Sequence, residues 1–385
     1  MPMVSQLIAI GCCRRKGRYY FSVLLSLKSL HRETIIFKVP MNYTECITMK
    51  LPTTIKPDNM RNLVEHFPQL LRSLQIDEKL LDISRKYHKD GLSGICFLGM
   101  GGSSITGNYV ATLLADESKI PLNIIRDYST PACVDKNWVV IAVSYSGNTE
   151  ETLSALSMAT EKGCRIFVIA SGGKMTQDTN HSLIHLPKGL QPRATLPLML
   201  SAILPITETL LGLEKTNFQE LEEVLISKAM TWREWLAPPS EVAHLFIDKI
   251  PLFISAKHLV PVAYRAKCQI NENSKALAFH SEIPESNHNE IESFVDTYGC
   301  SVVPIFLRSS FESPAIQKRF NVTSDIYQDM NLNPMNLKVD GKTKLEEMLV
   351  LTHFLDMVSL ELAELRNVDP VSVEKIKELK HRLSS

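Results

Sequence analysis

Two short segments of the sequence are rich in the small residues that bind anions. The first is GMGGSS, from Gly99 to Ser104, and the second is SYSGNTEE, from Ser144 to Glu151. Each follows an apolar run and precedes a helical pattern, so each is expected at a helix N-terminus. Free backbone N–H groups and the positive end of the helix dipole favour an anion there. One such segment would indicate helix capping, but two together favour an anion site.

The kind of anion is limited by what both segments lack. Neither contains the GxxxxGK[ST] pattern of nucleotide P-loops, which favours a small monophosphate over a nucleoside triphosphate. GMGGSS also approaches the dinucleotide pattern GxGxxG, but its sixth position is Ser104, and Asp127 follows the next apolar run. A dinucleotide-dependent oxidoreductase is therefore an alternative, although it gives the second segment no role.

The elements that must position these segments alternate along the chain. Continuous apolar runs such as WVVIAV are typical of strands buried on both faces, and helical patterns lie between them. This alternation predicts an α/β protein with mostly parallel sheets flanked by helices. We expect two doubly wound domains of similar architecture, at residues 55–236 and 240–385, joined by the linker APPSE. The closing helices, at 344–366 and 372–383, fit an interface or an ordinary core equally well.

Composition narrows the class of protein. The chain has 385 residues and a formal net charge of +0, which argues against general binding to nucleic acid or to a membrane surface. No apolar run approaches the ~20 residues that a membrane span needs. The eight cysteines include no CxxC pair, which indicates reduced thiols in a cytoplasmic protein rather than disulfides or a zinc site.

The N-terminal segment, residues 1–54, differs from the rest. Its first 50 residues hold eight Lys or Arg against two acids, and they lack the layout of a secretory signal. A basic regulatory arm and a targeting peptide are alternatives. We favour a weakly ordered basic extension, with Met41 or Met49 as a plausible translation start, because organised sequence begins near Lys56.

A longer motif narrows the function. The segment AYRAKCQINENSKALAFHSEIPESNHNE, from Ala263 to Glu290, resembles the bifunctional phosphoglucose/phosphomannose isomerase family. That family has two sugar isomerase (SIS) domains, and the two small-residue segments are similar to those of a SIS domain. The resemblance covers roughly residues 55–385. It implies a cytoplasmic homodimer of carbohydrate metabolism that interconverts glucose 6-phosphate and mannose 6-phosphate with fructose 6-phosphate, with no metal and no cofactor.

Such an isomerase opens the sugar ring and moves a proton between carbons 2 and 1 through an enediolate, which needs a base, an acid, a cation and a phosphate anchor. The family's motifs imply that Glu272 shuttles the proton and that Arg193 steadies the enediolate. They also imply that His288 opens the ring in the site of the partner subunit, and Lys380 is the best match for a further substrate contact. The implied phosphate-binding residues are Gly101, Gly102, Ser103, Ser144, Ser146 and Thr149.

Two of the catalytic residues have a simpler interpretation. Glu272 could pair with Lys275 one turn away, and His288 could cap a loop. Arg193 begins a helix, where a cation is unfavourable, so we expect an anionic partner for it.

Besides the dinucleotide-dependent oxidoreductase, one other function stays open from the residues alone. A non-catalytic SIS-type sugar-phosphate sensor would keep the hydroxyl-rich segments but should lack Glu272 and His288. A metal site formed by His280, Glu285 and Glu290 with His288 has no recognised spacing to support it. Whether both the glucose and the mannose epimer are accepted depends on pocket shape, which motifs do not give.

Overall fold

A computed structural model describes residues 7–15, 18–25, 54–178, 180–294 and 302–384. The chain forms two compact units, Met1–Cys46 and Ile47–Ser385. In the first unit, strands β1 (Leu7–Arg15) and β2 (Arg18–Leu25) pair in an antiparallel hairpin. The rest of the N-terminal extension up to residue 53 lies outside the described residues, so its expected weak order stays a prediction.

The second unit contains two parallel sheets, as the alternation of strands and helices predicted. The first sheet has the strand order β4-β3-β5-β6-β7, and every neighbouring pair is parallel. Its central strands are buried along their length, which explains their continuous apolar sequences. The strands are β3 (Gly94–Leu98), β4 (Leu122–Ile125), β5 (Trp138–Val143), β6 (Arg165–Ala170) and β7 (Ser182–His185).

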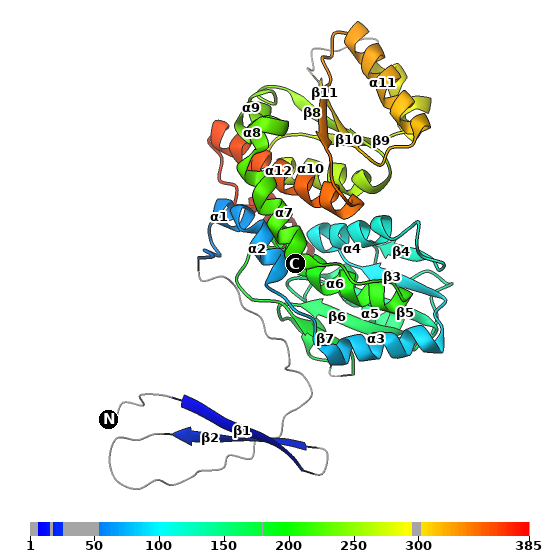
Figure 1. Ribbon diagram of the computed structural model, residues 1–385, viewed down its shortest axis with the longest axis vertical. Coiled ribbons are helices and arrows are strands. Elements are labelled where there is room, and N and C mark those ends of the chain that lie inside the picture. Colours follow the sequence, from blue (N-terminus) through cyan, green and yellow to red (C-terminus); the bar gives the residue numbers. More distant parts are fainter. Residues whose placement is uncertain (1–6, 16–17, 26–53, 179, 295–301, 385) are drawn as a thin grey trace. The chain divides into compact units, whose positions relative to one another are not determined.

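Helices cover both faces of the first sheet (Figure 1). Alternate residues of β5 divide between two cores: Val139 and Ile141 face α4 and α6, while Val140 and Ala142 face α5. Helices α3 and α4 both contact α6. The helices of this half are α1 (Met60–Glu65), α2 (Phe67–Arg72), α3 (Glu78–Asp90), α4 (Gly101–Leu113), α5 (Glu150–Glu161), α6 (Leu196–Leu211), α7 (Phe218–Met230) and α8 (Trp232–Trp235).

The second sheet is smaller and is also parallel, with the strand order β11-β10-β8-β9. Phe306 of β10 packs with Phe320 and Tyr327 of α11 on one face, and α10 and α12 cover the other. The short strands β9 and β11 were not predicted. The elements are β8 (Ile250–Ser255), β9 (Phe279–Glu282), β10 (Val302–Ser309), β11 (Met335–Val339), α10 (Val260–Asn273), α11 (Pro314–Asp329) and α12 (Lys344–Leu365).

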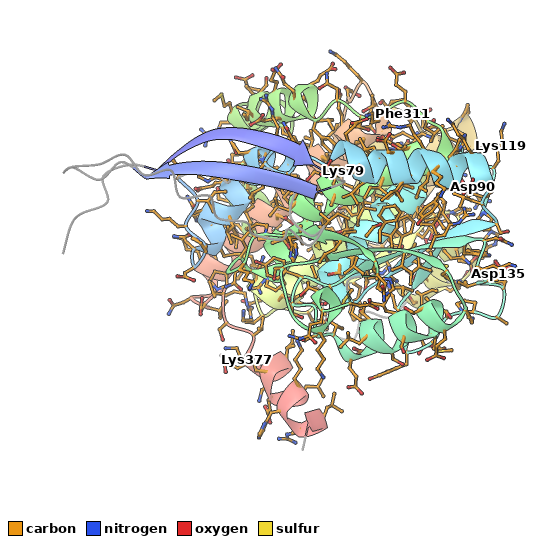
Figure 2. All side chains as sticks on the ribbon, turned by 90° about the horizontal axis from the view of Figure 1, so that it is seen from below. Lys79, Asp90, Lys119, Asp135, Phe311 and Lys377 are labelled. Carbon is orange, nitrogen blue, oxygen red and sulfur yellow. The ribbon has the colours of Figure 1, made fainter. Side chains whose placement is uncertain are left out.

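Helix α12 is a core element of this chain, being buried along almost its whole length. It contacts α10 of its own half, α7 of the first half and the short helix α9 (Pro239–His244), while α10 also contacts α4. The predicted linker APPSE is thus partly helical, because α9 begins inside it. The last helix, α13 (Glu374–Ser384), is mostly exposed and carries Lys377, labelled in Figure 2. Within the described residues, no helix is both long and apolar enough to cross a membrane.

Candidate active site

The two small-residue segments emerge at the same edge of the first sheet. Strands β3 and β5 are parallel neighbours, with Leu98 opposite Ala142, so the loops that follow them lie side by side. This is the switch point of the strand order, where open α/β sheets bind ligands. Helix α4 begins after Met100 and α5 begins after Thr149, and neither cap residue hydrogen-bonds its helix through its side chain. Capping therefore does not explain Thr149.

The loop after β5 is organised around Ser144. Its buried hydroxyl lies 2.9 Å from the Thr149 hydroxyl and accepts a hydrogen bond from the Gly147 N–H at 3.1 Å. Gly147 has a φ of +65°, and a Cβ there would lie 1.8 Å from the carbonyl oxygen of Gly172. Only glycine fits this position. Ser146 belongs to the same loop but is exposed, so the loop combines the buried hydroxyl of Ser144 with a serine open to solvent.

The loop after β3 approaches the residues that precede α6. A Cβ on Gly102 would lie 3.5 Å from the Pro192 carbonyl oxygen, so the two backbones are close. Gly101, in the first turn of α4, has a φ of +53°. The Ser103 hydroxyl is buried and faces the sulfur of Met199 at 3.7 Å. The N-terminus of α4 is therefore adjacent to Arg193.

Arg193 lies in a short 3-10 turn, η2 (Pro192–Ala194), which replaces the start of the long helix predicted from Pro192. Its side chain is buried, with Nε donating to Oδ1 of Asn273 at 2.7 Å and Nη2 to the carbonyls of Pro370 and Val371. Burial lowers the pKa of Arg193, while the negative charges of Glu272 and Asp369 oppose that effect. The hydrogen-bond partners of Arg193 are therefore uncharged oxygens and not the anionic partner that the sequence predicted. The carboxylates of Glu272 and Asp369 influence Arg193 only through their negative charge.

Glu272 lies in the last turn of α10, next to Asn273 and hence close to Arg193. Lys275 Nζ does not bind the Glu272 carboxylate, as the simpler interpretation required. It donates instead to the carbonyl oxygens of Glu272 and Asp369, at 2.5 and 2.8 Å. Among the described residues, the Glu272 carboxylate has no hydrogen-bond or ion-pair partner, and it is only partly buried. It is therefore available to a ligand.

Two predicted residues are not gathered with the others. His288 ends a 3-10 turn, η4 (Glu285–His288), that follows edge strand β9, and its side chain is exposed. Lys380 is exposed on α13. Among the described residues, no hydrogen bond or ion pair joins His288 to Glu272, Arg193 or the two hydroxyl-rich loops.

Sequence reasoning missed three contributors to this site. Arg126 follows β4, donates through Nε to the Ser104 hydroxyl, and lies 5.1 Å above the Tyr264 ring. Its position directly after a strand was a usable signal of a ligand-binding residue. The dinucleotide alternative pointed instead to Asp127, whose carboxylate accepts a hydrogen bond from the neighbouring Tyr128 N–H. Asn273 was not singled out from the sequence, because only the fold shows that it is buried and so needs a hydrogen-bond partner. The carbonyls of residues 370–371 had no sequence signal.

A cavity of about 520 Å³ lies elsewhere, between α4, α7 and the start of α12. None of the predicted site residues lines it, and its carboxylates would repel a phosphate: Glu117, Glu208, Glu214, Glu220 and Glu346. The described residues contain no cluster of three or more His, Cys, Asp or Glu side chains that could hold a metal ion. The acidic lining therefore argues against this cavity as the phosphate site.

Comparison with known proteins defines the class first. Residues 93–203 match the model of the SIS domain, and residues 237–383 match the bacterial phospho-glucose isomerase C-terminal SIS domain. The fold agrees with solved SIS-type structures. Tagatose-6-phosphate ketose/aldose isomerase from Escherichia coli aligns with a TM-score of 0.65 at 15% identity, covering 86% of this chain and 97% of that one. The protein is thus a two-SIS-domain α/β protein.

Curated relatives then define the family. The bifunctional phosphoglucose/phosphomannose isomerase of Aquifex aeolicus is 34% identical over 295 residues, covering 75% of this chain and 90% of the relative. The protein of the same name from Thermoplasma acidophilum is 33% identical, covering 82% of this chain and all of the relative. The chain belongs to the bifunctional phosphoglucose/phosphomannose isomerase family, as the segment from Ala263 to Glu290 indicated.

Proposed function

We propose that this chain interconverts glucose 6-phosphate and mannose 6-phosphate with fructose 6-phosphate. The observation that carries the proposal is the Glu272 carboxylate, which lies near Arg193 and has no partner among the described residues. A sensor would need no base at this place. The family's relatives bear the name of this activity, which supports the same substrates.

In the proposed reaction, Glu272 takes the proton from carbon 2 of the open-chain aldose phosphate and returns it to carbon 1. The hydroxyl proton moves from oxygen 2 to oxygen 1, so the formula is unchanged. Arg193 offsets the negative charge that develops on the enediolate oxygens. Its hydrogen bond to Asn273, which in turn donates to Ser359, holds the guanidinium in place before substrate binds.

The substrate's phosphate is proposed to bind at the N-termini of α4 and α5, held by the hydroxyls of Ser103, Ser144, Ser146 and Thr149 and by the N–H groups of Gly101 and Gly102. Hydroxyls and helix N-termini suit a phosphate dianion, and neither requires a metal. We also propose that Lys380, on α13, contacts the substrate.

We expect Ser144→Ala combined with Thr149→Ala to weaken fructose 6-phosphate binding by roughly 10–100-fold, because each hydroxyl lost is a donor to a charged acceptor. Calorimetric titration of the purified variant measures this. The matched control is Ser157→Ala with Thr160→Ala, since both residues are exposed on α5, the helix that follows Thr149. Unchanged affinity in the first variant would return Ser144 and Thr149 to a purely structural role.

We further propose that the chain acts as a homodimer in which His288 opens the sugar ring bound to the partner subunit. The exposure of its side chain supports a role in another chain's site. Mixing Glu272→Gln with His288→Ala subunits tests this, because each mixed dimer would contain one intact site if His288 acts in the site of the partner subunit. Recovery of activity on mixing supports the shared site, and no recovery in proven mixed dimers contradicts it.

The proposed setting is the cytoplasm, without nucleic-acid partners. Four cysteines in the described part of the chain are free thiols: Cys96, Cys133, Cys164 and Cys268. Free thiols suit a reducing compartment. The formal net charge of +0 supports a small-molecule substrate over a polyanionic partner.

Proton transfer through Glu272 has a direct chemical readout. Isomerisation of fructose 6-phosphate in heavy water should place deuterium at carbon 2 of the aldose product, because an enediolate exchanges its proton with solvent through the base. Nuclear magnetic resonance of the product measures the incorporation. Product formed without any deuterium would favour direct hydride transfer over the enediolate mechanism proposed for Glu272.

A further inference from the structure

The two sheets of the second unit share one topology. Reading outward from the edge strand, the first sheet runs β4-β3-β5-β6 and the second runs β9-β8-β10-β11, all parallel. By chain order, β8 corresponds to β3 and β10 corresponds to β5. The loops after β8 and β10 therefore correspond to the two loops that we propose bind phosphate at the first sheet.

The loop after β10 also offers hydroxyl donors. Ser309 ends the strand, Ser310 follows it, and Ser313 caps α11 through its side chain. The loop after β8 adds His258, which is buried. A sheet edge with these donors has the chemistry of an anion site, like the loop that contains Ser144.

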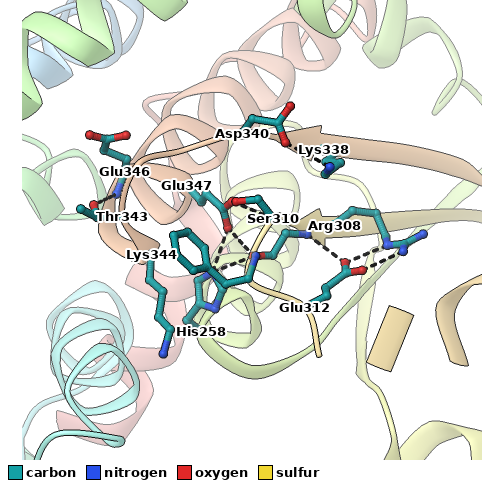
Figure 3. Close-up of polar contacts among 12 residues, drawn as sticks. His258, Arg308, Ser310, Glu312, Lys338, Asp340, Thr343, Lys344, Glu346 and Glu347 are labelled. Atoms are coloured by element: carbon teal, nitrogen blue, oxygen red, sulfur yellow. Dashed lines mark hydrogen bonds and ion pairs between the residues drawn. The ribbon is translucent and has the colours of Figure 1, made fainter. Parts of the chain in front are cut away.

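A carboxylate of the chain itself, that of Glu347, already accepts hydrogen bonds from donors of these two loops (Figure 3). One carboxylate oxygen of Glu347 accepts from the Ser310 N–H at 2.9 Å and from the Ser310 hydroxyl. The other accepts from the Ser309 hydroxyl and lies 3.0 Å from Nε2 of His258. Glu347 is fully buried in the first turn of α12. The donors of Ser309, Ser310 and His258 thus converge on this one carboxylate, while the Ser313 hydroxyl caps α11.

The surrounding chain is shaped to admit this carboxylate. A Cβ on Gly341 would lie 2.8 Å from Cγ of Glu347, so a larger residue there would press against the acid. Burial alone would raise the pKa of Glu347, but the hydrogen bonds from His258, Ser309 and Ser310 outweigh it and lower the pKa. The group is therefore an ionised carboxylate, which a buried position tolerates only with such donors.

We propose that Glu347 is a built-in anion that fills the phosphate cradle of the second sheet, so that each chain binds sugar phosphate only at the first sheet. The proposal rests on the proposed phosphate site through the comparison of the two loops. A cavity of about 210 Å³, lined partly by Lys257, His258 and Ser309, lies beside the filled cradle. Three polar groups that line this cavity are already engaged. His258 and Ser309 bind Glu347, and Lys344 pairs with Asp116 at 2.7 Å.

Removal of the carboxylate should convert the cradle into a site for external anions. We expect Glu347→Ala to lower Tm by roughly 5–10 °C, because it leaves buried donors without their acceptor. Inorganic phosphate should then restore much of that loss, relative to potassium chloride at equal ionic strength. The variant is made in the Ser144→Ala, Thr149→Ala background, so that phosphate bound at the first sheet does not contribute.

Two matched variants identify the source of any rescue. Glu346→Ala removes the neighbouring buried acid of α12 and should not respond to phosphate. Within the described part of the chain, the Glu346 carboxylate accepts a hydrogen bond from the Lys342 N–H alone. Glu347→Gln keeps the cradle filled by an uncharged side chain and should be destabilised without rescue. Equal phosphate responses in Glu347→Ala and Glu346→Ala would overturn the proposal.

The wild-type protein gives a test that does not depend on the variant folding. Calorimetric titration with fructose 6-phosphate should give one site per chain. Two equivalent sites per chain would show that the second cradle is accessible and would overturn the proposal. Neither readout measures isomerisation, so failure of the proposed reaction is seen separately, in the turnover of the wild-type enzyme.

Discussion

Replacement of Glu272 by Gln is expected to lower kcat for fructose 6-phosphate isomerisation by about 10²–10⁴-fold, the usual contribution of a positioned general base. Gln has the same shape but cannot take a proton. Because the Glu272 side chain makes no described hydrogen bond or ion pair, its replacement should leave the fold and sugar-phosphate affinity largely intact. Steady-state kinetics and calorimetric titration of the same preparation separate these effects.

The matched control for that experiment is Glu223→Gln. Glu223 is an exposed acid on α7 and is not one of the proposed site residues, so its replacement should leave kcat unchanged. A Glu272→Gln enzyme that retains more than about a tenth of the wild-type rate would show that the base has been assigned wrongly.

Replacement of Asp356 by Ala is expected to cost about 3–5 kcal/mol of unfolding free energy, because it strands a buried cation. Arg265 donates to Asp356 at 3.0 and 2.6 Å, and both side chains are almost fully buried between α10 and α12. The same guanidinium donates to the carbonyl oxygen of Arg193 at 2.9 Å. This pair therefore supports the backbone of the proposed enediolate-binding residue.

Denaturant unfolding measures the cost, and Glu364→Ala is the control on the same helix. Glu364 pairs with Arg61 at 2.8 Å, but its side chain is 74% exposed, so its loss should cost less than about 1 kcal/mol. Similar losses in the two variants would mean that the buried pair is not a principal support of the fold.

The sequence predicted the fold class well because long apolar strands and helix boundaries are local signals. The run WVVIAV became β5, and the helix expected after Thr149 is α5. The strands β9 and β11 escaped prediction because each has only four or five residues, several of them polar. Short strands depend on their neighbours in the sheet more than on their own composition.

The site was predictable only in part, for a related reason. The residues of SYSGNTEE are contiguous, so their grouping was visible before any fold was known. The hydrogen-bond partners of Arg193 are the Asn273 side chain and the carbonyls of residues 370–371, which are far apart in the chain. Only the packing of α10 and α12 brings them together. Glu347 gave no signal at all, since an acid in the first turn of a helix is ordinary.

The measurement that tests the central claim most directly is isomerisation of fructose 6-phosphate by the purified chain with EDTA present, following glucose 6-phosphate and mannose 6-phosphate separately. The proposal that Glu272 transfers the proton while Arg193 stabilises the enediolate predicts formation of both products at a rate that EDTA does not change. Tight binding of fructose 6-phosphate with neither product formed would contradict it, and would identify the chain as a sugar-phosphate sensor.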